Sequence, residues 1–341
     1  MKNDSSGFLE LLDAYISSYL PRAVGASVNT VKSYKYAFRL LIGFMYQQKK
    51  IQADKITFEN LDYEMLIEFF MWIEEERGCS ASTKNQRLSA LVSFSGYAQN
   101  RNFAAASVFR NSINKIPMKK ASKKKRAVFS MQEVTILLKL PDNCKETGLR
   151  DKVLLSLIYA SGARAQEICD LTVGNIQFHP KGASLNINGK GGKTRRIGIP
   201  NACADMLKKY IAHRNLNDKP ERHVFSSQTH EQMTVSCIEE IFKKYVSIAK
   251  KGNPLLFQEN SYPPHSMRHS TASHMLEAGV PLVVIKNFLG HTSLQSTQIY
   301  ADISQNTIDK HLKEWNEKWF PRNLANEEEP PKKDNIPAFL K

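Results

Sequence analysis

The chain has 341 residues, enough for two ordinary domains, and 42% of them are hydrophobic, which is typical of proteins that bury a core. No apolar run approaches the roughly 20 residues of a membrane span, and the N-terminus carries acidic and small polar side chains where a secretory signal needs a basic start. The 48 Lys and Arg against 33 Asp and Glu give a formal net charge of +15, which fits a polyanionic partner and, equally, a merely soluble basic protein.

Residues 1–114 predict a compact helical domain. Apolar side chains recur at spacings of three and four in residues 31–45, and again in residues 66–73, so each segment places them on one face of an α-helix. Asn29 or Thr30 is expected to cap the start of the first of these helices.

Residues 115–128 predict a linker, because Pro117 is followed by a dense run of Lys and Arg with almost nothing to bury. Like charges at this density repel one another and hold the chain extended. A solvated basic stretch, or a localisation signal in a eukaryotic host, is the alternative, but a position between two domains favours a path along a DNA backbone. The candidates for phosphate contacts are Lys119, Lys120, Lys123, Lys124, Lys125 and Arg126.

Residues 129–322 predict a second domain of helices and strands, followed by a charged, Pro-rich tail at 323–341 that is expected to be flexible. A helix at 149–160 ends at Gly162. The segments 183–188 and 195–199 flank the Gly-rich turn GKGGKT, a pattern typical of a β-hairpin. Further helices are predicted at 202–214, 235–250, 265–279 and 281–290. The fold class is therefore mainly α with a small β-sheet.

Four short stretches of the second domain combine charged and nucleophilic side chains. They read SGARAQEICDL (161–171), NGKGGKTRRI (188–197), PPHSMRHSTASHMLEAG (263–279) and LGHTSLQSTQIYADI (289–303). Each is weak when taken singly, since surface arginines, helix histidines and packed tyrosines are common. In combination and in this order they resemble the tyrosine recombinase (phage integrase) family, most closely the integrases and transposases of mobile elements.

The resemblance covers the second domain, the basic linker and the helical domain. In the family, an Arg stands two residues after a Gly and three before a Glu, and a Lys follows in a β-hairpin turn. A His-x-x-Arg and a Leu-Gly-His come next, with a Tyr nine residues after that last His. The matching positions are Gly162, Arg164 and Glu167, then Lys190, His265, Arg268, His291 and Tyr300. Ala163 stands where Leu is usual, and HSMRHS replaces HxLRHT; neither departure changes a functional group.

The resemblance implies a SAM-like helical DNA-binding domain and an α+β catalytic domain, together forming a C-shaped clamp on DNA. It also implies a site-specific recombinase that acts through a 3′-phosphotyrosyl link at Tyr300, and a homotetramer on two DNA sites. Accessory recombinases or directionality factors are possible partners, and no membrane partner is expected. The apolar stripe Ile308, Leu312, Trp315, Trp319 and Phe320 is a candidate to dock on a neighbouring protomer or on its own domain.

The chemistry of the matched side chains agrees with the resemblance. Breaking a phosphodiester develops negative charge on the nonbridging oxygens, which two permanently charged, fork-shaped guanidiniums (Arg164 and Arg268) suit. His265 and His291 can donate to the same phosphate or help the tyrosine lose its proton. A phenol with a pKa of about 10 is a poor nucleophile until neighbouring cations stabilise the phenolate of Tyr300.

The leaving 5′-oxygen needs a proton, and Lys190 in the Gly-rich turn is the candidate donor, with Lys193 as its competitor. Glu167 has no obvious chemical step, so it is expected to orient Arg164 or its helix. Further candidates for contacts with DNA are Lys32, Lys35, Lys84, Arg87, Lys193, Arg195 and His269.

No cofactor is expected. The sequence has no acidic cluster for two magnesium ions and no GxxxxGK[ST] phosphate loop. The cysteines lack CxxC or zinc-ligand spacing, which predicts reduced thiols and a cytoplasmic protein. They are Cys79, Cys144, Cys169, Cys203 and Cys237.

Three other functions compete with an integrase of a mobile element. A resolvase of chromosome or plasmid dimers has the same chemistry. A DNA-binding protein could keep the fold without the chemistry, although the complete set of matched residues argues against it. A type IB topoisomerase shares the tyrosine chemistry, but the separate helical domain and the spacing from the Leu-Gly-His to Tyr300 look more like a recombinase.

Overall fold

The computed structural model describes residues 6–120, 127–189, 192–227 and 229–291. The chain divides into two compact units, Met1–Lys124 (the helical unit) and Lys125–Lys341 (the mixed unit). The division falls inside the segment predicted as a linker. No helix in the described ranges is long and apolar enough to cross a bilayer.

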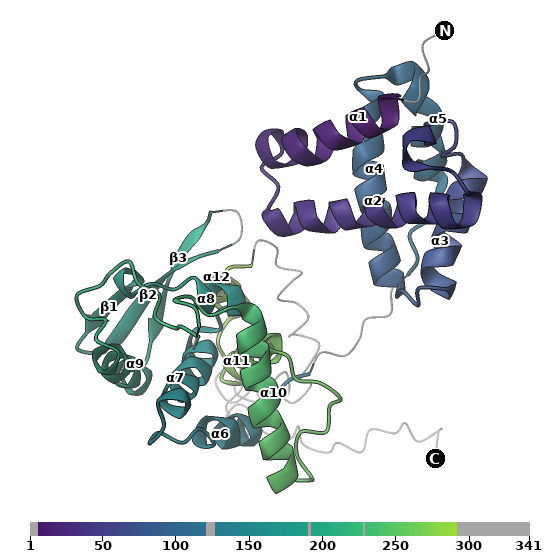
Figure 1. Ribbon diagram of the computed structural model, residues 1–341. Coiled ribbons are helices and arrows are strands. Elements are labelled where there is room, and N and C mark those ends of the chain that lie inside the picture. Colours follow the sequence, from purple (N-terminus) through teal and green to yellow (C-terminus); the bar gives the residue numbers. More distant parts are fainter. Residues whose placement is uncertain (1–5, 121–126, 190–191, 228, 292–341) are drawn as a thin grey trace, which may run out of the picture. The chain divides into compact units, whose positions relative to one another are not determined.

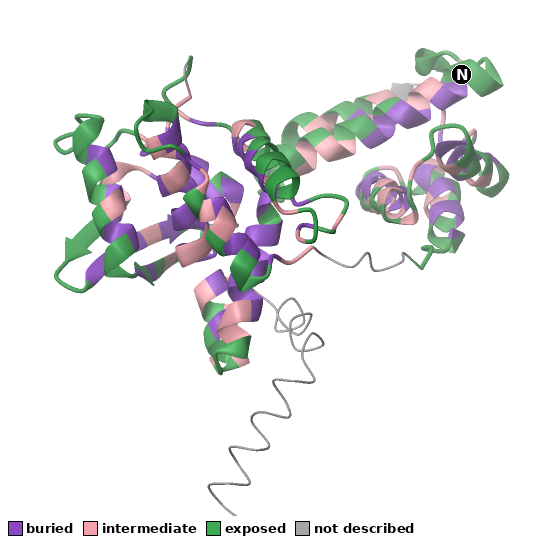
Figure 2. Cartoon of the chain, turned by 90° about the horizontal axis from the view of Figure 1, so that it is seen from below, coloured by how far each residue is buried: buried purple, intermediate pink, exposed green. Residues whose placement is uncertain are grey.

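The helical unit is built from seven helical elements in the part of it that the structure describes (Figure 1). They are α1 (Ser6–Ala14), the π-helix η1 (Tyr15–Ala23), α2 (Val28–Lys49), the 3-10 turn η2 (Ala53–Lys55), α3 (Tyr63–Glu75), α4 (Ala81–Gln99) and α5 (Phe103–Lys115). In α2 and α3 the buried positions recur along one side of the helix, and Figure 2 shows buried and exposed positions side by side on the helices of this unit. Phe94 lies at the centre of an aromatic cluster and contacts the rings of Phe8, Tyr15 and Phe38. This cluster forms the core of the unit.

Short polar side chains fix where the helices begin. Ser27 caps α2, with its hydroxyl accepting a hydrogen bond from the N–H of Thr30. The prediction of Asn29 or Thr30 as the cap was therefore wrong, because both lie within the first turn of the helix. Asp62 caps α3 and Ser80 caps α4 in the same way.

The mixed unit combines helices with a three-stranded antiparallel sheet in the order β1-β2-β3. Its elements are α6 (Met131–Lys139), α7 (Glu146–Ser161), α8 (Ala165–Cys169), η3 (Val173–Asn175), β1 (Ile176–His179), β2 (Gly182–Asn188), β3 (Thr194–Ile199), α9 (Asn201–His213), α10 (Val235–Gly252), α11 (Pro264–Glu277) and α12 (Leu282–Leu289). The predicted fold class is confirmed, including the hairpin, in which Asn188 pairs with Thr194 and Ala183 with Ile199.

The core of the mixed unit is formed by the sheet and helices α7 and α9, and it continues to helices α6 and α10 (Figure 1). In β2 the side chains of Leu185 and Ile187 are buried, and in β3 those of Ile197 and Ile199. All five cysteines are free. Burial raises the pKa of the Cys169 and Cys203 thiols to about 12, so these two act as apolar core residues.

Candidate active site

The site begins where α7 ends. Gly162 has a left-handed backbone (φ 56°), and a Cβ atom there would lie 2.8 Å from Cδ2 of Leu289. Only glycine meets both demands, so the chain can turn sharply and pass close to the end of α12. The turn ends α7, as predicted, and brings Arg164 to the start of α8.

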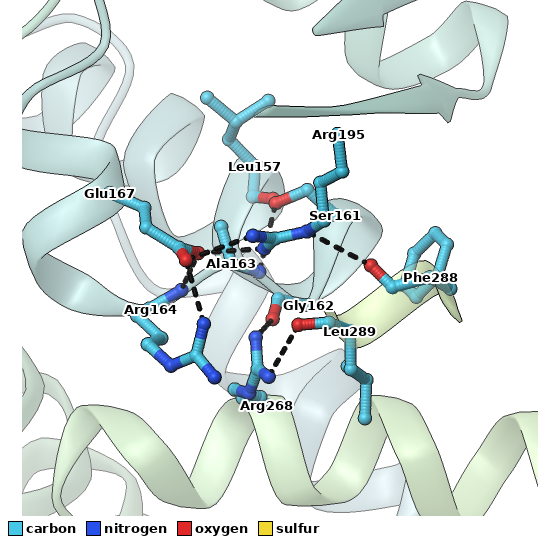
Figure 3. A network of polar contacts seen from close by, with 10 residues as sticks. All are labelled: Leu157, Ser161, Gly162, Ala163, Arg164, Glu167, Arg195, Arg268, Phe288 and Leu289. Carbon is cyan, nitrogen blue, oxygen red and sulfur yellow. Dashed lines mark hydrogen bonds and ion pairs between the residues drawn. The ribbon is translucent and has the colours of Figure 1, made fainter. Parts of the chain in front are cut away.

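Arg268 lies on α11 and is 2% exposed. Its Nη1 donates to the carbonyl oxygen of Gly162 and its Nη2 to that of Leu289, both at 2.6 Å (Figure 3). The buried guanidinium thus joins the turn before Arg164 to the turn before His291. Two charge-assisted hydrogen bonds offset part of the cost of removing the charge from water.

Glu167 in α8 is the hub of the other contacts. Its carboxylate accepts hydrogen bonds from the N–H and from Nη1 of Arg164, both at 2.8 Å. It also accepts Nη1 and Nη2 of Arg195, at 2.9 and 2.7 Å (Figure 3). Glu167 thus contacts Arg164, the residue that it was expected to orient.

The arginine contacts control the charge of this buried carboxylate. Burial by itself raises the pKa of Glu167, but the hydrogen bonds from Arg195 and Arg164 outweigh it and lower that pKa from the usual 4.5 to about 2. The carboxylate is therefore ionised at neutral pH, which keeps both arginine contacts charge-assisted.

Arg195 projects from β3 toward the interior of the site. Side chains alternate along this strand, and Arg195 shares a face with the buried Ile197 and Ile199, while Arg196 is exposed. Besides Glu167, Arg195 contacts the carbonyl oxygen of Phe288 through Nε at 3.2 Å. With a side chain only 12% exposed, Arg195 does not fit the contact with DNA for which it was a candidate.

Of the histidines singled out in the sequence, His265 and His269 lie on α11 and His291 follows α12. His265 is exposed in the first turn of α11, and its ring centroid is 6.3 Å from that of the buried His269. His291 is half-buried and follows Gly290, whose left-handed backbone (φ 66°) ends α12. The N–H of His291 donates to the carbonyl of Lys286 at 3.0 Å, which anchors the Leu-Gly-His turn to the helix.

Some predicted residues fall outside the described ranges. They are Lys190, Tyr300, Lys123, Lys124, Lys125, Arg126 and the apolar stripe 308–320. The hairpin that carries Lys190 is described up to Gly189, whose N–H donates to the carbonyl of Lys193 at 2.8 Å. Lys193 is exposed. In the described part of the chain, no group of three or more His, Cys, Asp or Glu side chains is placed to hold a metal ion.

The helical unit contains two kinds of candidate for contact with DNA: side chains that are exposed, and side chains that already contact other residues of the unit. Lys32 and Lys35 are exposed on α2, as are Lys119 and Lys120 after α5. Arg87 is half-buried, with its guanidinium 4.9 Å from the ring centroid of Tyr36.

Lys84 was a candidate for contact with DNA, and its burial argues against this role. It is 7% exposed, and its Nζ lies 3.0 Å from Oε2 of Glu74. The same carboxylate oxygen is 2.9 Å from Nζ of Lys119. Burial alone raises the pKa of Glu74, but the hydrogen bonds from Lys119 and Lys84 outweigh it and lower that pKa. Lys84 is therefore part of an internal ion-pair cluster.

Comparison with family models accounts for most of the chain. Residues 7–116 match the phage integrase SAM-like domain, and residues 109–307 match the phage integrase family. The chain belongs to the phage integrase family. The match covers both units, and it confirms that this protein is a tyrosine recombinase.

Other members of the phage integrase family match over most of their length. A tyrosine recombinase XerC of Chlamydia caviae is 29% identical over 88% of this chain and 95% of its own. A tyrosine recombinase XerD of Haemophilus influenzae is 27% identical over 92% and 99%.

The same fold occurs in solved structures. The XerH site-specific recombinase bound to a palindromic difH substrate has a TM-score of 0.68 at 19% identity, over 92% of this chain and 90% of that one. The Tn1549 transposon integrase in complex with circular intermediate DNA has a TM-score of 0.68 at 15% identity, over 89% and 98%.

Proposed function

We propose that the chain cuts and rejoins double-stranded DNA at specific sites through a covalent link at Tyr300, and that it integrates or excises a mobile element. The observation that carries this proposal is the convergence of Arg164, Arg268 and the Leu-Gly-His turn. Three segments far apart in the sequence meet there, joined by the bonds of Arg268 to Gly162 and Leu289. These are the segments that the family motifs pick out.

In the proposed reaction the two guanidiniums bind the nonbridging oxygens of the scissile phosphate. Arg164 is 30% exposed at its side chain, so part of its donor set faces solvent although Nη1 is held by Glu167. Charge that develops on the phosphate in the transition state is stabilised by donors already in position, which lowers the barrier without a reorganisation step. His265 and His291 donate to the same phosphate.

The bonds and protons balance without an added reactant. One of the two histidines, His265 or His291, takes the proton of the Tyr300 phenol, and the phenolate oxygen attacks phosphorus. The bond from phosphorus to the 5′-oxygen breaks, and Lys190 gives that oxygen a proton. A 5′-hydroxyl of a partner strand then gives its proton to Lys190 and attacks the phosphotyrosine. The bond from phosphorus to the phenol oxygen breaks, Tyr300 regains its proton from the histidine, and the phosphodiester is restored.

Binding of double-stranded DNA is supported by the net charge of +15 and by the DNA-bound structures of recombinases with this fold. We propose that the helical and mixed units clamp the duplex, with Lys32, Lys35 and residues 115–128 on its phosphates. Four copies act on two DNA sites, with accessory recombinases or directionality factors as further partners. The mobile-element role rests on the resemblance of the motifs to integrases and transposases.

A trapping experiment tests the chemistry. The protein is incubated with nicked suicide duplexes tiled across the DNA that flanks its own gene, without magnesium or ATP, and run on a denaturing gel. A covalent adduct with wild type that is lost in Tyr300→Phe is the expected result. An adduct that persists in Tyr300→Phe places the nucleophile elsewhere.

Two further readouts separate the alternatives. Relaxation of a plasmid that lacks any trapped site indicates a topoisomerase. Excision of the DNA between two trapped sites flanking the gene supports the mobile-element role, whereas resolution of plasmid dimers alone supports a dimer resolvase.

A further inference from the structure

Arg195 uses every nitrogen of its guanidinium on the protein itself. Nη1 and Nη2 form a fork on the two carboxylate oxygens of Glu167, and Nε donates to the carbonyl oxygen of Phe288. These partners lie 28 residues before and 93 residues after Arg195 in the chain. One side chain of the hairpin therefore contacts the helix of the first motif and the end of the helix before the fourth motif.

The surroundings leave little freedom for this guanidinium. A Cβ atom at Gly290 would lie 2.9 Å from Cδ of Arg195 and 3.0 Å from its Nη1. A Cβ atom at Gly189 would lie 3.4 Å from the same Nη1. The side chain is thus enclosed between two glycines, one directly before Lys190 in the sequence and the other directly before His291.

The pattern of partners requires arginine. Its planar fork matches a carboxylate with two parallel bonds and still has Nε for a third acceptor at an angle to them. A lysine has one nitrogen and cannot make the same three contacts. Because Glu167 in turn holds Nη1 and the N–H of Arg164, any shift of Arg195 is passed to Arg164 through a single carboxylate.

We infer that Arg195 is a positioning residue of the active site: it ties the β2–β3 hairpin to Glu167 and to the main chain before His291, and so holds Arg164 and His291 in one arrangement. This inference rests on the proposed function for its catalytic consequence. Arg195 itself touches neither DNA nor the reacting atoms.

The test compares wild type with Arg195→Gln and Arg195→Lys, and uses Arg196→Gln as the matched control, since Arg196 is the exposed neighbour on the other face of β3. Adduct formation is followed in a single turnover on a nicked duplex that wild type cleaves, at saturating protein. DNA affinity is measured separately by anisotropy on the same duplex without a nick.

The expected result is a loss of about 10- to 100-fold in the rate constant for Arg195→Gln, with DNA affinity within about twofold of wild type. Arg195→Lys recovers only part of the rate, and Arg196→Gln keeps the wild-type rate constant. A merely structural role would reduce the amplitude of the reaction, that is the fraction of active protein, and leave the rate constant unchanged. That result, or an unchanged rate and amplitude, overturns the inference.

If Arg195 instead contacts a DNA phosphate, Arg195→Gln gives a third pattern of results. Affinity falls, and the slope of log affinity against log salt becomes shallower by about 0.9, while the rate at saturation is unchanged. This outcome also overturns the inference.

Hydrogen exchange provides a readout that does not depend on the chemistry. In Arg195→Gln, exchange is expected to increase at the N–H groups of Arg164 and His291 and not in the helical unit, and Arg196→Gln leaves it unchanged. Equal exchange in wild type and Arg195→Gln would show that Arg195 does not position Arg164 and His291. If exchange increases in Arg195→Gln but wild type gives no adduct that depends on Tyr300, the proposed function is wrong and the positioning role of Arg195 is still supported.

Discussion

Asn85 binds the main chain of Lys119 in both directions. Its Nδ2 donates to the carbonyl oxygen of Lys119 at 2.7 Å, and its Oδ1 accepts the N–H of Lys119 at 3.0 Å. Asn85 lies on α4, and Lys119 follows α5 by four residues. Together with the ion pair between Lys119 and Glu74, this contact fastens the beginning of the basic segment to the helical unit.

Asn85→Ala is expected to release the start of the basic segment, at Lys119, from α4. Two hydrogen bonds are lost, each with a net value of about 1 kcal/mol, so local opening increases by roughly tenfold or more. The measurement is the initial rate of trypsin cleavage after Lys119 and Lys120 under native conditions. Gln86→Ala, at the exposed neighbouring position, controls for any general effect on α4, and equal cleavage in both variants would contradict the prediction.

Lys84 and Lys35 are expected to respond differently to neutralisation. Lys35→Gln removes an exposed charge from α2, so DNA affinity decreases and the salt slope becomes shallower by about 0.9. Lys84→Gln leaves the slope unchanged, because this lysine is occupied by Glu74, but lowers the free energy of unfolding by about 1–2 kcal/mol. The salt slopes are checked by measuring DNA affinity at several salt concentrations, and the free energy of unfolding is checked by denaturant titration. A shallower slope for Lys84→Gln would show that its ion pair opens to DNA.

The low pKa of Glu167 predicts a pH dependence of stability. A carboxyl whose pKa falls from 4.5 unfolded to about 2 folded contributes stability that is complete above pH 4.5 and is lost as pH decreases toward 2. The contribution is at most about 3 kcal/mol at neutral pH. The difference in unfolding free energy between wild type and Glu167→Gln should therefore shrink from pH 5 to pH 2. A constant difference over that range would be inconsistent with the lowered pKa.

Gly290→Ala is expected to be costly for two reasons. The left-handed backbone disfavours any Cβ atom, and this one would meet Arg195 at 2.9 Å. Gly78→Ala is the matched control, since Gly78 has a similar backbone (φ 60°) with nothing within 4 Å of an added Cβ. Both variants lose about 1 kcal/mol of stability from the backbone, but only Gly290→Ala should also slow adduct formation. Equal rates of adduct formation in the two variants would mean that Arg195 can move away from the added Cβ atom without loss of activity.

The long elements were predictable because their signals are local. The periodicity of α2, the glycine that ends α7 and the two halves of the β2–β3 hairpin can all be seen in a short window of sequence. The strand β1 was missed, since it has four residues and only Ile176 among them is buried. The helix α8, with five residues, is shorter than the window in which helical periodicity can be detected.

Residue type and spacing singled out Arg164, Glu167 and Arg268, but the contacts that these side chains make could not be predicted from the sequence. The burial of Lys84 depends on Glu74, which lies on a different helix, so no pattern within α4 reveals it. Arg195 is different. Its alternation with Ile197 and Ile199 already indicates an inward position, and a stricter use of strand periodicity would have removed it from the candidates for contact with DNA.

Arg268 donates two hydrogen bonds to main-chain carbonyls, those of Gly162 and of Leu289. Every residue type has such a carbonyl, so no substitution at either position can delete the acceptor itself. These two acceptors can therefore be displaced only by a change in the path of the backbone. A change of side chain next to Gly162, such as Ala163 in place of the family's usual leucine, therefore removes neither acceptor.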